Sequence, residues 1–537
     1  MSKHRLSSAP IPPAKRLHTL SSPSPSLLPF SFENSLSDEI VVLIFSHLSS
    51  VDLCQSQPTS KSWSRLASDN ELWRDLFLKA FGRPRLRGSR GFVGRTDGKE
   101  VKSLPGRANT ELVKDWKWMF RISTNWRNGR CAVEDVDVIP RVPSIHAGQT
   151  HILLAGPLTI LASSRESSTP EIRLRTAACS NHTLAYTPAA SQQPVRITAL
   201  ALDQSVPTSG HIRMACFISS GEFTVFSTNH TEPSKSHRIL TYVPTRRSAR
   251  VSPIMHAVYH HPLLMTLSEA FTLSIYDLST GTAKLTQMLT SFTSFPPTSL
   301  VLSMPTPSTY KLILTYAIPV YPAHWSVGVT ELIIAGLPTA NSSTLPSSSS
   351  FLSPEVEPMT IISTRTARAV DIPQGWIDER KLAQMREQWS RKVARIADVH
   401  TDGKWVILAP EDSVQSSSSG HASSLYTPTS LQLYRLSLPS TSSVSSSGPK
   451  LMFVKTLTGQ LGPISALSLS DGRCVSFGLN GSIWVWDMER GVGAEVAKPE
   501  EGGTFDNLDL TKRSVAFDER RIVTAVDSKI AVRRFDI

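Results

Sequence analysis

Few residues in this sequence have the types and spacing that catalysis or metal binding requires. It contains no GxxxxGK(S/T) loop to cradle phosphates, no GxSxG nucleophile elbow and no HExxH zinc motif. The best metal candidates are His256, His260 and His261. Residues four apart on a strand are separated by roughly 13 Å, which is too far to share one ion. We therefore expect surface or turn histidines, with no metal, no cofactor and no catalytic residue.

The most informative side chains lie in residues 36–77, which run from an acidic start through an apolar stretch and SKSW to a closing LWRDLF. After Asp38, apolar residues recur at helical spacing: Ile40, Leu43, Ile44 and Leu48. Val41 and Phe45 widen this face beyond what one short helix buries within its own domain. Further short helices are expected near Val51 and Ser60, giving three helices with a marginal core. Part of the apolar face should therefore contact a partner.

These residue types, in this order, resemble an F-box. The resemblance implies a small helical domain that binds the Skp-type adaptor of cullin-based ubiquitin ligases. By position, it implies that adaptor binding involves Leu36, Ile40, Ile44, Leu48, Leu53 and Trp63. Two positions depart from the family pattern: Ser37 replaces the usual proline, and Pro58 is expected to break the helix before Lys61. The alternative is an ordinary three-helix packing module.

The rest of the chain must form at least one further domain, because 537 residues far exceed one helical module. The five cysteines are scattered and form no CxxC pair, which predicts reduced thiols in an intracellular protein of the cytoplasm, the nucleus or both. The longest apolar run, residues 40–45, is too short to cross a membrane. We expect no membrane contact.

The net charge of +12 is concentrated near the N-terminus. Residues 1–30 contribute +4 and residues 83–130 contribute +9, so the remainder is nearly neutral. A basic linker can touch phosphates, but it carries no base-reading motif. We expect a connector, with no specific nucleic acid as partner.

A helix is expected between the F-box-like segment and the large domain. Residues 110–126 place Leu112, Trp116, Met119 and Phe120 on one face, with Thr110 as N-cap and Gly129 after the end. The string WKWMFRISTNWRNGRC resembles the linker helix of F-box proteins of the WD-repeat type. A generic buried helix is the alternative.

From residue 131 onwards, short alternating strands indicate a sandwich, a barrel or a propeller. Residues 464–488 resemble a WD repeat that ends in Trp486-Asp487, with Gln460 in place of the family's histidine. Weaker units bring the count to seven, which favours a seven-bladed propeller, with six or eight as alternatives. Because the chain stops after the third strand of the last unit, residues 131–138 are expected to supply its outer strand.

Several segments look like insertions into this β domain. Ser-rich stretches predict surface loops, and we assign insertions to residues 341–396, 411–424 and 437–448. Within the first, residues 378–396 predict an amphipathic helix with Asp378 as N-cap and an apolar stripe: Leu382, Met385, Trp389, Val393 and Ile396. Such a stripe either packs on its own domain or docks a partner.

The sequence thus predicts an α+β multidomain protein. Its parts are a disordered tail (1–31), an F-box (32–82), a basic and helical linker (83–130) and an all-β WD-type propeller (131–537). The resemblance implies a non-catalytic substrate receptor: the F-box binds the Skp adaptor and through it cullin, and the propeller binds a protein substrate, phosphorylated or not. The alternative is a propeller scaffold without a role in ubiquitin transfer.

Overall fold

The computed structural model describes residues 36–82, 115–137, 148–176, 181–189, 193–205, 210–230, 232–244, 252–291, 294–306, 308–335, 359–371, 375–411, 428–438, 448–499, 513–526 and 529–537. The expected tail, most of the basic linker and most of the Ser-rich stretches lie outside these residues. The chain divides into two compact units, residues 1–76 and 77–537. Each is described by itself.

The first unit is built from short helices: α2 (Asp38–Phe45), α3 (Ser50–Ser56), α4 (Lys61–Ala67) and α5 (Asn70–Phe77), of which α5 ends at the unit boundary. The described part of this unit holds four helices where three were expected, because LWRDLF lies in a helix of its own, α5. Ser49 and Asp52 cap α3 reciprocally, and the Ser60 side chain accepts a hydrogen bond from the Trp63 backbone N–H to start α4. Pro58 lies in the turn between α3 and α4, so the predicted break before Lys61 is confirmed.

The linker helix, α7, spans Trp116–Asn128 and belongs to the second unit. The Asp115 side chain accepts a hydrogen bond from the Trp118 backbone N–H, and Gly129 ends the helix with φ of +65°. The predicted C-terminal end is confirmed. Asp115, not Thr110, is the N-cap, and Thr110 lies outside the described residues.

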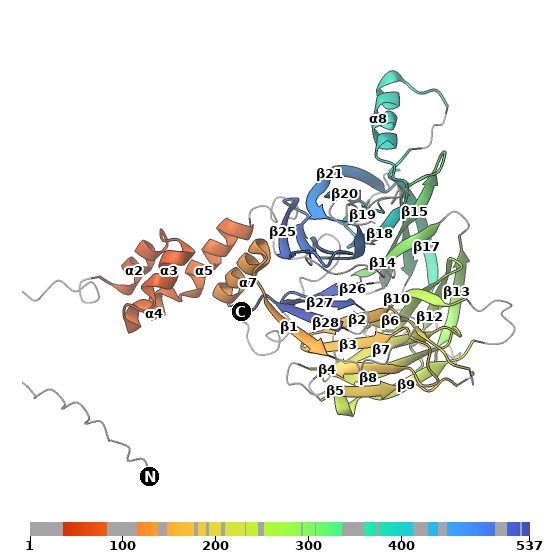
Figure 1. Cartoon of the computed structure of the whole chain (residues 1–537), viewed down its shortest axis with the longest axis horizontal. Coiled ribbons are helices and arrows are strands. Elements are labelled where there is room, and N and C mark those ends of the chain that lie inside the picture. The colour runs from red at the N-terminus through yellow and green to blue at the C-terminus, as the bar shows by residue number, and fades with distance from the viewer. Residues whose placement is uncertain are drawn as a thin grey trace, which may run out of the picture. The chain divides into compact units, whose positions relative to one another are not determined.

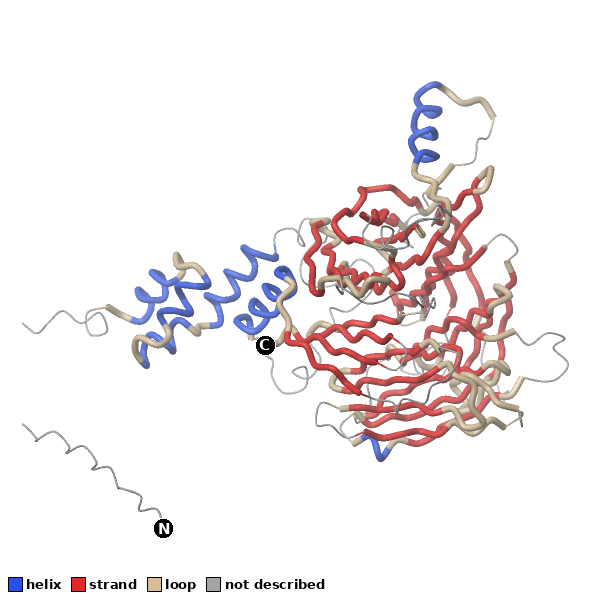
Figure 2. Tube along the Cα trace, in the orientation of Figure 1, coloured by secondary structure: helices blue, strands red, loops and turns tan. Residues whose placement is uncertain are grey.

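Seven four-stranded antiparallel sheets form the propeller, as predicted (Figures 1 and 2). Blade one contains β2 (Thr150–Ala155), β3 (Leu158–Ser163), β4 (Glu171–Arg175) and β5 (Asn181–Ala185). Blade two contains β6 (Ile197–Leu202), β7 (His211–Ile218), β8 (Phe223–Asn229) and β9 (His237–Tyr242), with a 3₁₀ turn at Pro233–Lys235. Blade three contains β10 (Ile254–His260), β11 (Leu263–Ser268), β12 (Thr272–Asp277) and β13 (Lys284–Thr290).

The remaining four blades complete the ring. Blade four contains β14 (Phe295–Thr306), β15 (Thr309–Val320), β16 (His324–Ala335) and β17 (Thr360–Arg368). Blade five contains β18 (Ile396–Thr401), β19 (Trp405–Pro410), β20 (Pro428–Ser437) and β21 (Lys450–Leu461). Blade six contains β22 (Ile464–Ser470), β23 (Arg473–Gly478), β24 (Ile483–Asp487) and β25 (Val492–Ala497). Blade seven contains β26 (Ser514–Phe517), β27 (Arg521–Val526), β28 (Lys529–Arg534) and β1 (Ala132–Asp137).

The ring closes where the sequence predicts. Strand β1 pairs antiparallel with β28, from Ala132 opposite Arg534 to Asp137 opposite Lys529. The first strand of each blade contacts the first strand of the next, and β26 contacts β2. An apolar cluster fills each of the seven junctions between neighbouring blades. The propeller is therefore held together by contacts between blades that one blade alone lacks.

Blade six carries a buried polar network around the WD signature. The Trp486 indole N–H donates to Ser476 Oγ at 2.8 Å, and Ser476 donates to the side chain of Gln460. Gln460 Nε2 in turn donates to Ser482 Oγ at 3.1 Å. Gln460 lies on β21, the outer strand of blade five. From the position where the repeat family has histidine, it therefore links that strand to β23 and to the turn before β24 in blade six.

The expected insertion at 341–396 was drawn too wide. Residues 360–368 form β17, the outer strand of blade four, so they belong to the ring. The helix that follows, α8, spans Glu379–Ser390, and the Asp378 side chain caps it as predicted. Val393 and Ile396 lie beyond its end, in an isolated β-bridge and in β18 respectively. None of the described helices has the length and apolar character needed to span a membrane.

Candidate functional site

The first helix of the helical unit presents an apolar face to solvent. Val41 and Phe45 are buried, and the Phe45 ring meets the Trp63 ring edge-on, with 5.4 Å between centroids. Three neighbours on α2 point away from this core: Ile40 is 47% exposed, Leu43 63% and Ile44 40%. Three large apolar side chains exposed on one short helix leave a surface that water solvates poorly. This outward face of α2 is the candidate partner-binding site.

The six residues proposed for adaptor binding fall into three groups. Ile40 and Ile44 are exposed on α2, whereas Leu36, Leu48 and Trp63 are half-buried. Leu53 is fully buried, at 0% exposure, so its place is in the core behind this surface.

Two exposed residues were left out of that set. Leu43 lies between Ile40 and Ile44, and Val51 at the start of α3 is 61% exposed. The helical spacing had placed Leu43 on the apolar face, and that spacing was the signal that identified it. No pattern in the sequence distinguishes an exposed Val51 from a buried one.

Charged groups mark the start of α2. Asp38 and Glu39 occupy its first turn, where the helix dipole favours negative charge. A backbone hydrogen bond and a further one from the Ser37 side chain lower the pKa of Glu39. Asp38 also pairs with Arg65 of α4 at 2.5 Å, although both side chains are largely exposed. Exposed pairs contribute little stability, so the apolar core must hold α2 in place.

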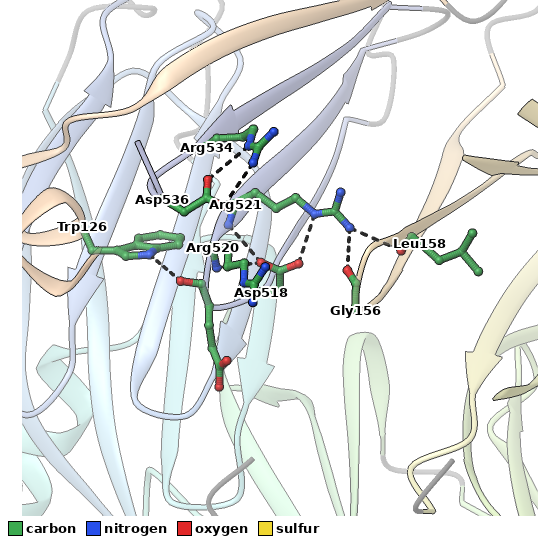
Figure 3. Close-up of polar contacts among 9 residues, drawn as sticks. Trp126, Gly156, Leu158, Asp518, Arg520, Arg521, Arg534 and Asp536 are labelled. Atoms are coloured by element: carbon green, nitrogen blue, oxygen red, sulfur yellow. Dashed lines mark hydrogen bonds and ion pairs between the residues drawn. The ribbon is translucent and has the colours of Figure 1, made fainter. Parts of the chain in front are cut away.

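In the second unit, the linker helix is fixed to blades six and seven. The indole of Trp126 stacks on Phe535, with 3.8 Å between centroids, and its N–H donates to the Glu519 carbonyl at 2.9 Å (Figure 3). The Arg473 guanidinium covers the Trp126 ring at 4.2 Å. Asn125 Nδ2 donates to the Phe535 carbonyl at 2.9 Å. Ile122 and Trp126 are the buried side chains of α7, so the face expected from Trp116, Met119 and Phe120 is only half-buried.

The residues that precede the linker contact the same helix. A π-helical turn, Leu78–Gly82, follows α5. The carbonyl of Ala80 accepts hydrogen bonds from Arg127 at 2.7 Å and from Arg490 of blade six. The Arg127 guanidinium lies 4.1 Å over the ring of Phe81. The π-helical turn and α7 are thus packed together with blade six within the second unit.

Side chains reinforce ring closure at the first turn of blade seven. Arg521 bridges to blade one by donating to the carbonyls of Gly156 at 2.9 Å and Leu158 at 3.4 Å (Figure 3). Asp518 orients this arginine through an ion pair at 3.1 Å. Desolvation alone raises the pKa of Asp536. The hydrogen bonds and charge of Arg534, a backbone hydrogen bond and the charge of Arg520 together outweigh this effect, so the pKa of Asp536 is lowered. These contacts attach blade seven to blade one, and we assign them a structural role.

The described residues hold no cluster of three or more His, Cys, Asp or Glu side chains that could bind a metal ion. His261 lies in the turn between β10 and β11, as expected, whereas His256 and His260 lie on β10. All three are half-buried, so each keeps part of its side chain exposed.

A cavity of about 110 Å³ opens on blade one, lined by Leu161, Arg173, Arg175, Asn181 and Thr183. Arg175 pairs with Glu134 of the closing strand at 3.0 Å, and Arg173 pairs with Glu171 at 3.6 Å. Both guanidinium groups therefore already have carboxylate partners. The cavity lies next to the closing strand β1, and its two arginines already take part in ion pairs.

An apolar-faced helical domain followed by a seven-bladed propeller defines the class of F-box proteins with a propeller. Residues 35–79 match the model of an F-box-like domain, and residues 164–529 match the model described as the F-box protein pof12 beta-propeller. The second match covers more than half of the sequence. The chain belongs to the F-box protein pof12 beta-propeller family.

Individual relatives share less of the sequence. The chain is 29% identical over 135 residues to proteins named "Probable E3 ubiquitin ligase complex SCF subunit sconB" from Arthroderma benhamiae, Trichophyton verrucosum and Arthroderma otae. Each match covers 22% of this chain and 20% of the relative, so the chain spans about a fifth of the length of these curated relatives. A solved structure of the computationally designed Ika8 protein aligns over 71% of this chain and 82% of its own, with 10% identity and a TM-score of 0.33. That likeness is too low to bear on the fold.

Proposed function

We propose that this chain is the substrate-recognition subunit of a cullin-type ubiquitin ligase. The F-box binds a Skp-type adaptor, and through it cullin, while the propeller binds the protein substrate. The observation that carries the proposal is the exposed face of α2, Ile40, Leu43 and Ile44, within a domain of the F-box-like family. The names of the sconB relatives support the same assignment.

In this function the chain carries out no covalent step. It holds a substrate close to the ubiquitin-carrying enzyme and so raises the effective concentration of the substrate lysines. Leu36, Leu48 and Trp63 border the contact, and Leu53 supports it from the core. The free thiols of Cys54, Cys131, Cys216 and Cys474 fit a protein of the cytoplasm, the nucleus or both.

The test replaces Leu43 or Ile44 by Asp in the full chain. Either change places a charge in the buried contact and should weaken adaptor binding by about 30-fold or more. Both side chains are substantially exposed in the chain itself, so the F-box should stay folded. Binding is measured by titrating purified Skp-type adaptor against each variant.

Met288→Asp is the matched control, because Met288 is 59% exposed on the outer strand of blade three. It should bind the adaptor like the original chain. Equal adaptor affinity for all three variants would rule out the α2 face as the site. Binding of the adaptor without recovery of cullin would favour the scaffold alternative.

A further inference from the structure

An apolar segment of the sequence lies a short distance before α2. Four of the six residues 27–32 are large and apolar, namely Leu27, Leu28, Phe30 and Phe32. The first 26 residues contain five large apolar residues in all. The match to the F-box-like domain begins at residue 35, so residues 27–32 precede that domain, and they lie outside the residues that the structure describes. Their apolar side chains therefore call for an explanation separate from the family fold.

The outward face of α2 is a surface of matching character. Ile40, Leu43 and Ile44 follow one another at spacings of three and four residues, so they lie on one side of the helix, and they are 40–63% exposed. Val41 and Phe45 fill the core on the other side. Water solvates a contiguous apolar patch poorly. A chain without adaptor therefore gains free energy when another apolar segment covers this face.

Chain connectivity favours residues 27–32 as the segment that covers it. Five residues separate Phe32 from Asp38, the first residue of α2. Five extended residues span at most about 17 Å, and a helix of the length of α2, eight residues, is about 12 Å long. The segment therefore reaches the whole outward face. A connection this short gives an effective concentration in the millimolar range, which exceeds that of a second copy of the chain at micromolar concentration.

Charge does not oppose this contact. The first turn of α2 carries two exposed carboxylates, Asp38 and Glu39. An acidic segment would be repelled there. Residues 17–32 contain no Asp, Glu, Lys or Arg. The segment is thus complementary to the α2 face in its apolar character and is neutral beside the charged helix start.

We propose that residues 27–32 cover the outward face of α2 when no adaptor is bound. Their leucine and phenylalanine side chains pack on Ile40, Leu43 and Ile44, and the adaptor displaces them when it binds. The competition with the adaptor rests on the function proposed above, whereas the contact within the chain does not. The apparent affinity for the adaptor is reduced in proportion to the fraction of chains whose α2 face is free.

The contact is tested by photo-crosslinking in the full chain without adaptor. A benzophenone amino acid takes the place of Leu43, whose side chain is 63% exposed. Illumination should join it to residues 27–32 of the same chain, as located by mass spectrometry of the monomer. The tail variant, Leu28→Ser, Phe30→Ser, Phe32→Ser, should lower the yield about fivefold or more, because it keeps the connection and removes apolar side chains. An unchanged yield would reflect chain proximity alone and overturn the proposal.

Adaptor affinity provides the second measurement. Titration of purified Skp-type adaptor should show binding about threefold or more tighter for the tail variant than for the original chain, because the face is no longer covered. The matched control is Leu6→Ser, Ile11→Ser, Leu17→Ser, which removes three apolar side chains from the earlier part of the tail. It should leave both the crosslink and the adaptor affinity unchanged.

The inference and the proposed function fail in different ways. A crosslink that depends on the three tail side chains, in a chain that does not bind the adaptor, rejects only the proposed function. Equal adaptor affinity for the original chain and the tail variant, with binding still weakened by Leu43→Asp, rejects only this inference. Crosslinks between two chains in place of crosslinks within one chain would also overturn it.

Discussion

His261 joins the first turns of blades two and three. Its backbone N–H donates to Asp203 Oδ1 at 2.9 Å, and its ring nitrogen Nδ1 lies 3.3 Å from the Tyr259 hydroxyl. Burial is the main reason that the pKa of the imidazole falls below its ordinary value of 6.5. Arg213 lowers it further, against the opposing charges of Asp203 and Asp277. The folded propeller therefore favours neutral His261.

This burial predicts a pH dependence of stability. As pH falls below 6.5, the unfolded chain takes up a proton at His261 before the folded chain does, so the free energy of unfolding decreases. Above that pH both states are neutral and the effect vanishes. Thermal melting at about pH 7.5 and about pH 5.5 should show a smaller drop for His261→Gln than for the original chain.

The exposed His237 on β9 provides the control, and His237→Gln should retain the original pH dependence. An unchanged drop in His261→Gln would assign the acid sensitivity to other groups.

Residue types alone predicted some of these positions and missed others. Asp378 was identified as a cap because a polar residue precedes an apolar stripe. Thr110 satisfied the same rule for the linker, yet the helix begins after Asp115, which is also a capping residue type. The sequence thus offers two acceptable caps five residues apart, and the capping rule alone does not choose between them.

At the scale of elements, α7 is attached to the propeller mainly through Trp126, whose ring is enclosed by Phe535 and Arg473. Replacing Trp126 by Ala removes that packing and leaves a cavity, at a cost of about 3–5 kcal/mol. The expected result is a lower melting temperature together with faster proteolytic cleavage within residues 116–128.

Arg121→Ala is the control on the same helix, since Arg121 is exposed and makes one long hydrogen bond, 3.3 Å, to the Asp536 carbonyl. It should melt and resist proteolysis like the original chain. Equal protection of α7 in both variants would mean that Trp126 does not anchor the helix.

The outer strand of blade four illustrates why one element escaped prediction. Residues 360–368 read TIISTRTAR, with polar residues at most positions. An outer propeller strand pairs along one edge only and packs weakly, so it needs no continuous apolar face. Its burial pattern alternates between exposed and half-buried residues, with Ala367 alone fully buried. Inner strands such as β15 are strongly apolar, and these were recognised.

At the scale of the molecule, the seven blades and their closure were predictable because the repeats could be counted in the sequence and a propeller must form a closed ring. Each blade needs neighbours on both sides, so seven repeats and one missing outer strand specify a ring that an earlier segment must complete. Ring closure places no constraint on the number of F-box helices or on the length of the insertions, so these were predicted less well. The α2 face was anticipated in kind, since one short helix had more apolar residues than its own domain buries.

Ring closure can be tested with the same substitution at two positions of β1. Val136 is 4% exposed and packs in the junction between blades seven and one, with Leu161, Val523 and Ile530. Val133, three residues earlier on the same strand, is 57% exposed. If β1 closes the ring, Val136→Asp buries an unpaired carboxylate in that junction and should cost about 3 kcal/mol or more.

Val133→Asp should change stability by no more than about 0.5 kcal/mol, because water still solvates its carboxylate. Urea unfolding, followed by intrinsic fluorescence, compares the two variants with the original chain. A closed ring also predicts that Val136→Asp exposes the edge of β28 and lowers solubility, since an unpaired strand edge promotes association between chains. Equal stability and solubility for the two variants would show that β1 does not complete blade seven. The observed pairing of Val136 with Ile530 and of Val133 with Arg533 predicts the opposite.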